Sequence, residues 1–194
     1  MKKLLLISLL AVSSTGLAQE NFFRLDGGIG FATTFGNVRS YGISASTEPK
    51  FFFNPNISVG LRLEGNVLFG AKIKTSTEDV NAAMSARSAY LLKGEYYLGD
   101  GNTKPFFGLM GGYYVQANVG GGTSGVSAYG GKTWGGAPEI GVTFGNFRMS
   151  ALYHFVAGKD LVSASTSVGT ETIEVGRSYF IFQLGFRVFG VGDQ

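Results

Sequence analysis

The sequence contains no cysteine and a single histidine, His154, among its 194 residues. The missing thiols exclude disulfide frameworks, thiolate zinc sites and cysteine nucleophiles, and one histidine excludes any site that needs two imidazoles. Charge is also scarce, at 15% of the residues, but 17 Phe, 9 Tyr and 1 Trp make the chain too aromatic for a disordered protein. We therefore expect a folded protein with no catalytic residues, no metal site and no cofactor.

The first eighteen residues have the composition of a secretory signal peptide. Lys2 and Lys3 precede an apolar run over 4–12, and the small residues Gly16 and Ala18 follow it. This run is well short of the roughly 20 residues that a spanning helix needs, so we predict an exported chain with cleavage after Ala18. Residues 1–18 are then the signal peptide, and residues 19–194 form one domain.

The mature chain is almost neutral. Loss of two of its 16 basic residues with the signal peptide leaves 14 basic residues against 13 acidic ones. A nucleic-acid partner is therefore not expected, because the basic surface that such a partner requires is missing.

Apolar and polar residues alternate through most of the mature chain, which is typical of β-strands exposed to two different environments. Each strand supplies the roughly 9–11 residues that a tilted membrane strand requires. Pro49 and Pro138 fall inside predicted strands, where each removes a ladder donor, and we expect a bulge at Pro138. The pattern predicts eight strands, at about 23–35, 41–53, 57–69, 86–98, 105–117, 134–144, 147–157 and 179–188.

The connections between these strands alternate in length. Tight turns are expected at 54–56, 99–104 and 145–146, where turn-forming residues gather. The other connections, at 36–40, 70–84, 118–133 and 158–176, are mostly long and rich in Gly, Ser and Thr, and the first of them is the shortest. This order predicts an up-and-down barrel whose two ends face different compartments.

On each of the eight strands, one face can be assigned that carries no charged residue. The environment of this uncharged face decides the class of barrel. A lone basic group at mid-bilayer costs roughly 2–4 kcal/mol, and a barrel of eight strands has room inside only for modest side chains. We therefore predict that the uncharged face meets lipid and that the charged face fills the lumen with paired side chains. The uncharged face carries aromatic residues near strand ends: Phe23, Phe35, Phe53, Phe69, Tyr96, Phe107, Trp134, Phe144, Phe147, Tyr153 and Phe155. The polar face carries Arg24, Asp26, Glu48, Lys50, Arg62, Glu64, Arg87, Lys93, Glu95, Glu139, Arg148, Arg177 and Arg187.

The predicted fold class is thus all-β, an eight-stranded antiparallel up-and-down transmembrane barrel. With its segments Phe51-Phe52-Phe53-Asn54-Pro55-Asn56 and Tyr96-Tyr97-Leu98-Gly99-Asp100-Gly101, the chain resembles the small outer-membrane β-barrel superfamily, which includes OmpX-like, OmpW-like and opacity-protein barrels. The resemblance implies a location in the cell outer membrane, contact with outer-membrane lipid and lipopolysaccharide, and assembly by the barrel-insertion machinery. Members commonly end on an aromatic residue, whereas here Val188 ends the apolar face and 189–194 follow, so we expect a variant insertion signal.

We expect a non-enzymatic barrel with a side-chain-filled lumen and a structural or loop-display role in the cell envelope, without a porin-like open pore. The alternative is OmpW-like passage of small apolar molecules, for which Phe106, Met110 and Tyr114 on the inner face of one strand would line a short channel. A soluble periplasmic lipocalin-like carrier would instead need the aromatic face inside.

A lipid-modifying barrel enzyme is a further alternative. Outer-membrane deacylases resemble the chain around Tyr153-His154-Phe155, but Val156 stands where those enzymes have a nucleophilic serine. Ser150 lies about 13 Å from His154 at strand rise, beyond hydrogen-bond reach.

The loops carry charges of both signs. Basic side chains there would suit lipopolysaccharide phosphates, but acidic ones in the same loops favour an ordinary solvated surface. The basic set is Arg39, Lys72, Lys74, Lys132 and Lys159, and the acidic set is Glu78, Asp79, Asp160, Glu171 and Glu174.

Overall fold

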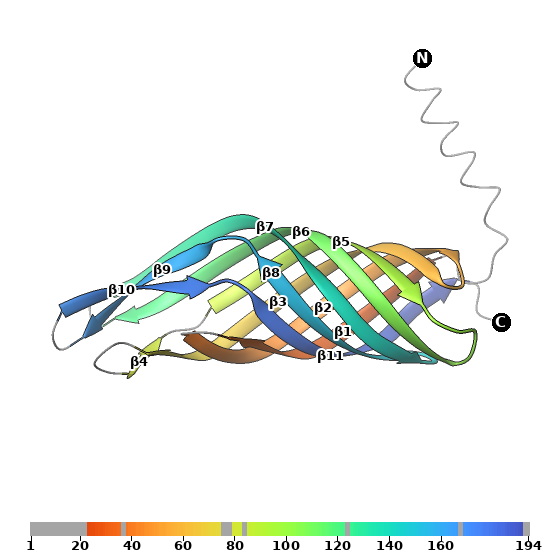
Figure 1. Ribbon diagram of the computed structural model, residues 1–194, viewed down its shortest axis with the longest axis horizontal. Coiled ribbons are helices and arrows are strands. Elements are labelled where there is room, and N and C mark those ends of the chain that lie inside the picture. Colours follow the sequence, from red (N-terminus) through yellow and green to blue (C-terminus); the bar gives the residue numbers. More distant parts are fainter. Residues whose placement is uncertain are drawn as a thin grey trace, which may run out of the picture.

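The computed structural model describes residues 23–35, 38–74, 79–82, 85–122, 125–166 and 169–191, so the predicted signal peptide lies outside the described residues. Eight strands form one antiparallel barrel (Figure 1). They are β1 (Phe23–Thr34), β2 (Val38–Asn54), β3 (Ile57–Lys74), β5 (Ser85–Tyr97), β6 (Thr103–Gly122), β7 (Gly125–Phe144), β8 (Phe147–Val156) and β11 (Tyr179–Val191).

Each strand of the barrel pairs with its neighbours along the chain, and the pairing of the first strand with the last closes the wall. β1 pairs with β11, for example Ile29 with Leu184, and β2 pairs with β3, for example Ala45 with Gly65. The predicted eight-stranded antiparallel up-and-down barrel is therefore confirmed. Among the described residues, no helix is long and apolar enough to cross a membrane.

Tight turns connect the strands at the end of the barrel where β1 begins and β11 ends (Figure 1). In the first turn, the Asn54 Oδ1 accepts hydrogen bonds from the backbone N–H groups of Asn56 at 2.9 Å and Ile57 at 2.8 Å. Gly99 and Gly145, with φ values of 81° and 56°, occupy the other two turns, in a region that side chains disfavour. The three predicted turns are thus confirmed.

The opposite end carries longer hairpins, which contain more strand than the sequence predicts. β6 and β7 stay paired up to Gly122 and Gly125, and β4 (Asp79–Ala82) pairs with the end of β3. β9 (Lys159–Thr166) and β10 (Gly169–Gly176) form a separate two-stranded sheet. The prediction of loops across 70–84, 118–133 and 158–176 is wrong in this respect. Backbone pairing does not require apolar and polar residues to alternate. The Gly, Ser and Thr of these segments do not produce such an alternation, so the sequence pattern does not reveal the strands.

Neither proline changes the register of its strand. Pro49 lies inside β2 opposite Leu25, and Pro138 lies inside β7 opposite Leu109. The pairing of β7 with β8 is interrupted beside Pro138 but resumes with equal steps on both strands. The predicted bulge at Pro138 is therefore wrong, since only the hydrogen bonding of the missing N–H is lost.

A bulge does occur near the end of the last strand. The register of β1 with β11 shifts between Leu25 and Asp26, and Val188 has no partner there. Val188 and Phe189 are consequently both outward, 56% and 53% exposed. The prediction that the apolar face ends at Val188 is wrong, because the bulge places an aromatic residue, Phe189, on the outer face after it.

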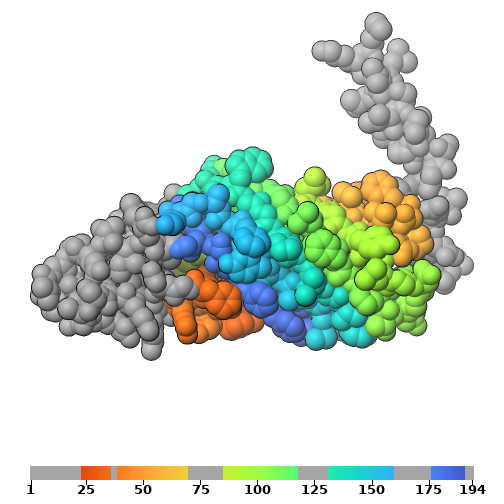
Figure 2. Space-filling view, viewed as in Figure 1, coloured from red at the N-terminus to blue at the C-terminus, as the bar shows by residue number. Residues whose placement is uncertain are grey.

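The two faces of the wall have opposite character, as predicted. Apolar side chains cover the outside, where Trp134 and Phe147 are 69% and 70% exposed. Figure 2 shows this outer surface, on which successive strands form oblique bands. Eleven of the thirteen charges assigned to the polar face are buried inside. The exceptions are Arg177, which lies between β10 and β11 at the rim, and Arg187, half-buried near the turns. This is the organisation of a transmembrane barrel.

Candidate functional site

The interior of the barrel is the most unusual chemical environment in the described chain, because six basic and five acidic residues are buried together there. They come from β1, β2, β3, β5, β7 and β8, on which alternate residues point inward. The basic residues are Arg24, Lys50, Arg62, Arg87, Lys93 and Arg148, and the acidic ones are Asp26, Glu48, Glu64, Glu95 and Glu139.

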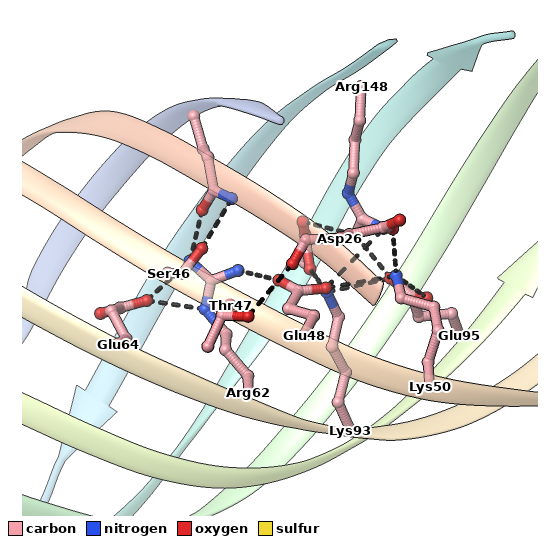
Figure 3. Close-up of polar contacts among 12 residues, drawn as sticks. Asp26, Ser46, Thr47, Glu48, Lys50, Arg62, Glu64, Lys93, Glu95 and Arg148 are labelled. Atoms are coloured by element: carbon pink, nitrogen blue, oxygen red, sulfur yellow. Dashed lines mark hydrogen bonds and ion pairs between the residues drawn. The ribbon is translucent and has the colours of Figure 1, made fainter. Parts of the chain in front are cut away.

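A network of ion pairs crosses the lumen in the half that lies nearer the tight turns, the turn-side half (Figure 3). Lys93 Nζ lies 2.8 Å from Glu48 Oε2, 2.9 Å from Glu95 Oε1 and 2.5 Å from Glu139 Oε2. Arg148 Nη2 lies 2.5 Å from Glu95 Oε1 and 2.7 Å from Glu139 Oε1. These five residues belong to β2, β5, β7 and β8, so the network ties opposite walls together.

Lys50 extends this network to β1. Its Nζ lies 2.9 Å from Asp26 Oδ2 and 2.9 Å from Glu95 Oε2. Asp26 also accepts from Arg24 at 2.5 Å, and the Tyr97 hydroxyl donates to Glu95 at 2.7 Å. Each carboxylate in this half therefore has several donors, as buried charge requires.

Arg62 joins the two halves of the lumen. Its side chain is fully buried, and its Nη2 lies 2.7 Å from Glu64 Oε2. The same guanidinium donates to Glu48 and to the side-chain carbonyl of Gln183. Gln183 in turn donates to the Ser46 hydroxyl at 2.9 Å, so Arg62 links β3 to β2 and β11 (Figure 3).

The hairpin-side half is built around His154. The Tyr114 hydroxyl and His154 Nδ1 are hydrogen-bonded at 3.0 Å, and Glu64 Oε1 lies 3.6 Å from Nε2. The His154 ring stacks on Tyr179, with centroids 4.3 Å apart and planes 4° from parallel. Tyr179 donates its hydroxyl to Glu64 at 3.0 Å, and the Arg87 guanidinium lies 5.3 Å from the centre of the Tyr179 ring.

The described side chains at this mouth of the lumen are closely packed. A cavity of about 10 Å³ lies among side chains that include Arg87, Tyr114, Val156 and Tyr179. That volume holds about one water molecule. Interlocking side chains, rather than an open passage, therefore occupy the lumen at this level.

The three residues considered for an apolar channel do point inward. Phe106, Met110 and Tyr114 are each 3% exposed, which confirms the predicted face. Arg148 covers the Phe106 ring, with its guanidinium 3.8 Å from the ring centre, and Tyr114 is bonded to His154. Two of these three side chains thus contact the polar network directly.

The residues considered for catalysis are buried in the same lumen. Ser150 and Val156 lie on the inner face of β8 with His154. The hydrogen-bond and ring partners of His154 are Tyr114, Glu64 and Tyr179, and Ser150 is not among them. In the described part of the chain, no group of three or more His, Asp or Glu side chains is placed to hold a metal ion.

The loop charges are only partly described. Arg39, Lys132 and Lys159 are exposed at the hairpin end. The side chains of Lys72, Lys74, Glu78, Asp79, Asp160, Glu171 and Glu174 lie outside the described residues.

The inward position of the lumen charges could be predicted from the sequence, but the aromatic stack of Tyr179 on His154 was not predicted. A usable signal exists, because Tyr179 falls on the polar face of its strand with Gln183. A tyrosine in a confined polar interior needs a partner for its hydroxyl. That partner, Glu64, lies 115 residues away in sequence, so its identity follows only from the barrel register.

Comparison with known proteins identifies the fold. No protein-family model matches the chain, and no curated protein matches it in sequence. The crystal structure of neisserial surface protein A (NspA) matches with a TM-score of 0.59 at 12% identity, covering 88% of this chain and 98% of that chain. The N-terminal β-barrel domain of Pseudomonas aeruginosa OprF matches with a TM-score of 0.44 at 12% identity, covering 87% of this chain and 99% of that one. Ail of Yersinia pestis, solved with the heparin analogue sucrose octasulfate, matches with a TM-score of 0.44 at 10% identity and the same coverages, 87% and 99%. The NspA match shows that this chain has the fold of the small eight-stranded outer-membrane barrels.

Proposed function

We propose that the chain is an integral outer-membrane barrel whose lumen is closed to solutes and whose extended hairpins serve a structural or binding role at the cell surface. The observation that carries this proposal is the ion-pair network from Lys93 and Arg148 to Glu48, Glu95 and Glu139, which crosses the lumen. A solute could pass only if these pairs separated, which would leave buried charges without partners.

The outer surface supports the membrane location. Exposed aromatic rings occur toward both ends of the wall, such as Phe53 near the turns and Trp134 toward the hairpins. Amphipathic rings favour the level of the lipid headgroups. Small outer-membrane barrels keep their short turns in the periplasm, so the hairpins β6–β7 and β9–β10 extend outward from the cell.

Two surface features agree with the partners that the resemblance implies. Arg39, Lys132 and Lys159 are exposed toward the hairpin end, where they suit phosphate groups of lipopolysaccharide. Phe189 gives the last strand an outward aromatic residue, which suits recognition by the barrel-insertion machinery.

The first test asks whether the chain is a folded, closed membrane barrel. We expect the protein to stay in the envelope after carbonate extraction and to change gel mobility on boiling. In planar bilayers we expect no conductance of porin size. Release by carbonate would refute the membrane location, whereas large ohmic conductance from retained protein would refute only the closed lumen.

Passage of small apolar molecules is less well supported, because the Phe106 ring is covered by the charged Arg148 side chain. An enzymatic role is also less well supported, because His154 is fully buried and bonded to Tyr114. Uptake of an apolar dye by protein-containing vesicles above the rate of empty ones would favour passage. Release of acyl chains from lipid A that His154→Ala abolishes would favour an enzyme.

A further inference from the structure

The outer wall carries a groove of about 550 Å³ where β11, β1, β2 and β3 lie side by side. Its base is formed by Ala45 and Gly65 together with the backbone of Gly30 and Ser44. Its remaining lining is apolar and consists of Ile29, Phe31, Ile43, Val67, Phe182 and Leu184.

The strand register explains why the wall is hollow at this point. One row of outward residues runs across the four strands as Leu184, Ile29, Ala45 and Gly65, so its side chains shrink along the row. A Cβ atom built on Gly65 would meet no other atom within 4 Å. The next row toward the hairpins is bulky throughout, with Phe182, Phe31, Ile43 and Val67.

A basic side chain lies beyond this groove toward the hairpins, on the same outward face of β2. Arg39 and Tyr41 precede Ile43 on the outward side of β2, and Arg39 is exposed. Four residues of strand place Arg39 about 13 Å from Ile43 along the strand, comparable with half the roughly 30 Å hydrocarbon core of a bilayer. Tyr41 stacks on Phe31 between the two levels, with ring centroids 6.0 Å apart.

We propose that the groove holds an acyl chain of an anionic membrane lipid whose headgroup is bound at Arg39. This site rests on the membrane location proposed above. An apolar groove at mid-wall with a cation near headgroup level matches the two parts of such a lipid, hydrocarbon below and negative charge above.

A second copy of the barrel fits this groove less well than a lipid chain. Ile29 and Ile43 project beside its base, 65% and 66% exposed. Two convex walls would meet through these ridges and leave the groove empty, with the loss of dispersion contacts that a void entails. A flexible chain can follow the groove and fill it.

Gly65 allows a direct test, because it has open space over it and no left-handed backbone. In Gly65→Leu the new side chain occupies the groove, and in Ala45→Phe a side chain fills it from the neighbouring strand. Gly94→Leu is the matched control, because Gly94 is also an outward glycine with no atom within 4 Å of a built Cβ but lies on β5, outside the groove lining.

The measurement is native mass spectrometry of the mature barrel in detergent, titrated with phosphatidylglycerol or with phosphatidylcholine of the same acyl chains. We expect the wild type and Gly94→Leu to retain one phosphatidylglycerol. Gly65→Leu and Ala45→Phe should bind it about tenfold more weakly, the effect of excluding roughly two methylene groups. Arg39→Gln should abolish the preference for phosphatidylglycerol over phosphatidylcholine and leave binding of the chain itself.

Three results would overturn the proposal. They are equal retention by the wild type and Gly65→Leu, an equal loss in Gly94→Leu, and a wild-type dimer that Gly65→Leu dissociates, which would identify a second copy as the occupant. Every variant is first checked for carbonate retention and a heat-dependent gel shift. Failure of the wild type in that check would refute the membrane location, whereas unchanged lipid binding by properly inserted variants would refute only the groove.

Discussion

Leu92 and Lys93 are consecutive residues of β5, yet Leu92 is 62% exposed and Lys93 is 3% exposed. In a water-soluble protein this would be an inverted pattern. Here an outer side chain stabilises the barrel according to how apolar it is at its depth in the membrane, and it needs no particular partner. The inner face depends on named partners, because each buried charge is tolerated only beside its counter-charges. Substitutions should therefore follow different rules on the two faces.

The largest effect is expected from Arg62, which connects both halves of the inner network. Arg62→Leu would leave Glu48 and Glu64 short of a donor in a buried site. We expect a loss of about 3–5 kcal/mol in the free energy of unfolding, the usual cost of breaking a buried pair on one side. Urea unfolding in lipid vesicles measures it, and Lys132→Leu, at an exposed residue, should change stability by less than about 0.5 kcal/mol. A loss of similar size in both variants would show that the network is not specific.

A charge placed on the outer face should have the next largest effect. Leu92→Arg puts a cation in the middle of β5 toward lipid, at an expected cost of about 2–4 kcal/mol. Leu98→Arg is the control, because Leu98 is 52% exposed beyond the end of the same strand, where the cost falls to about 0–1 kcal/mol. Comparison of the two variants by vesicle unfolding tests the depth dependence directly. Equal stability of both variants would instead fit a wall that faces water.

The inner and outer faces could be predicted from the sequence because strand alternation has a period of two and a charge in lipid is costly. Glu48 and Lys50 were assigned inward in this way despite Pro49 between them, and both are buried. The identity of their partners could not be predicted. Lys50 and Glu95 are 45 residues apart, and only the closed register brings them together.

Two kinds of feature could not be predicted from the sequence, for different physical reasons. The bulge beside Val188 depends on one unmatched residue between β1 and β11, which neither strand reveals alone. The β9–β10 hairpin pairs through its backbone, and its Ser- and Thr-rich sequence contains too few apolar residues for a long alternating pattern. The wall groove needs both kinds of information, because Ala45 and Gly65 become neighbours only through the register.

A smaller effect is expected from one inner hydroxyl group. Tyr179→Phe keeps the ring on His154 but removes the donor to Glu64 at 3.0 Å. We expect a loss of about 1.5–3 kcal/mol, typical of a hydrogen bond to a charged group. Tyr90→Phe removes a hydroxyl from an outer residue that is 54% exposed and should be nearly neutral. Unfolding of both variants in lipid vesicles compares the two faces for the same Tyr-to-Phe change. Equal losses of stability would contradict the proposed difference between the inner and outer faces.

The smallest effect is expected at Trp134, on the outer face. Its ring packs edge-on against Tyr113, with centroids 5.6 Å apart, and such pairs contribute about 0.5–1.5 kcal/mol. Trp134→Phe keeps an aromatic ring there, so we expect a loss of less than about 1 kcal/mol. Because Trp134 is the single tryptophan, its fluorescence in the wild type also reports its depth. Lipids brominated near the headgroup should quench it more than lipids brominated near the chain end. The opposite order would place Trp134 at mid-bilayer, and the wall would then lie shifted along the membrane normal.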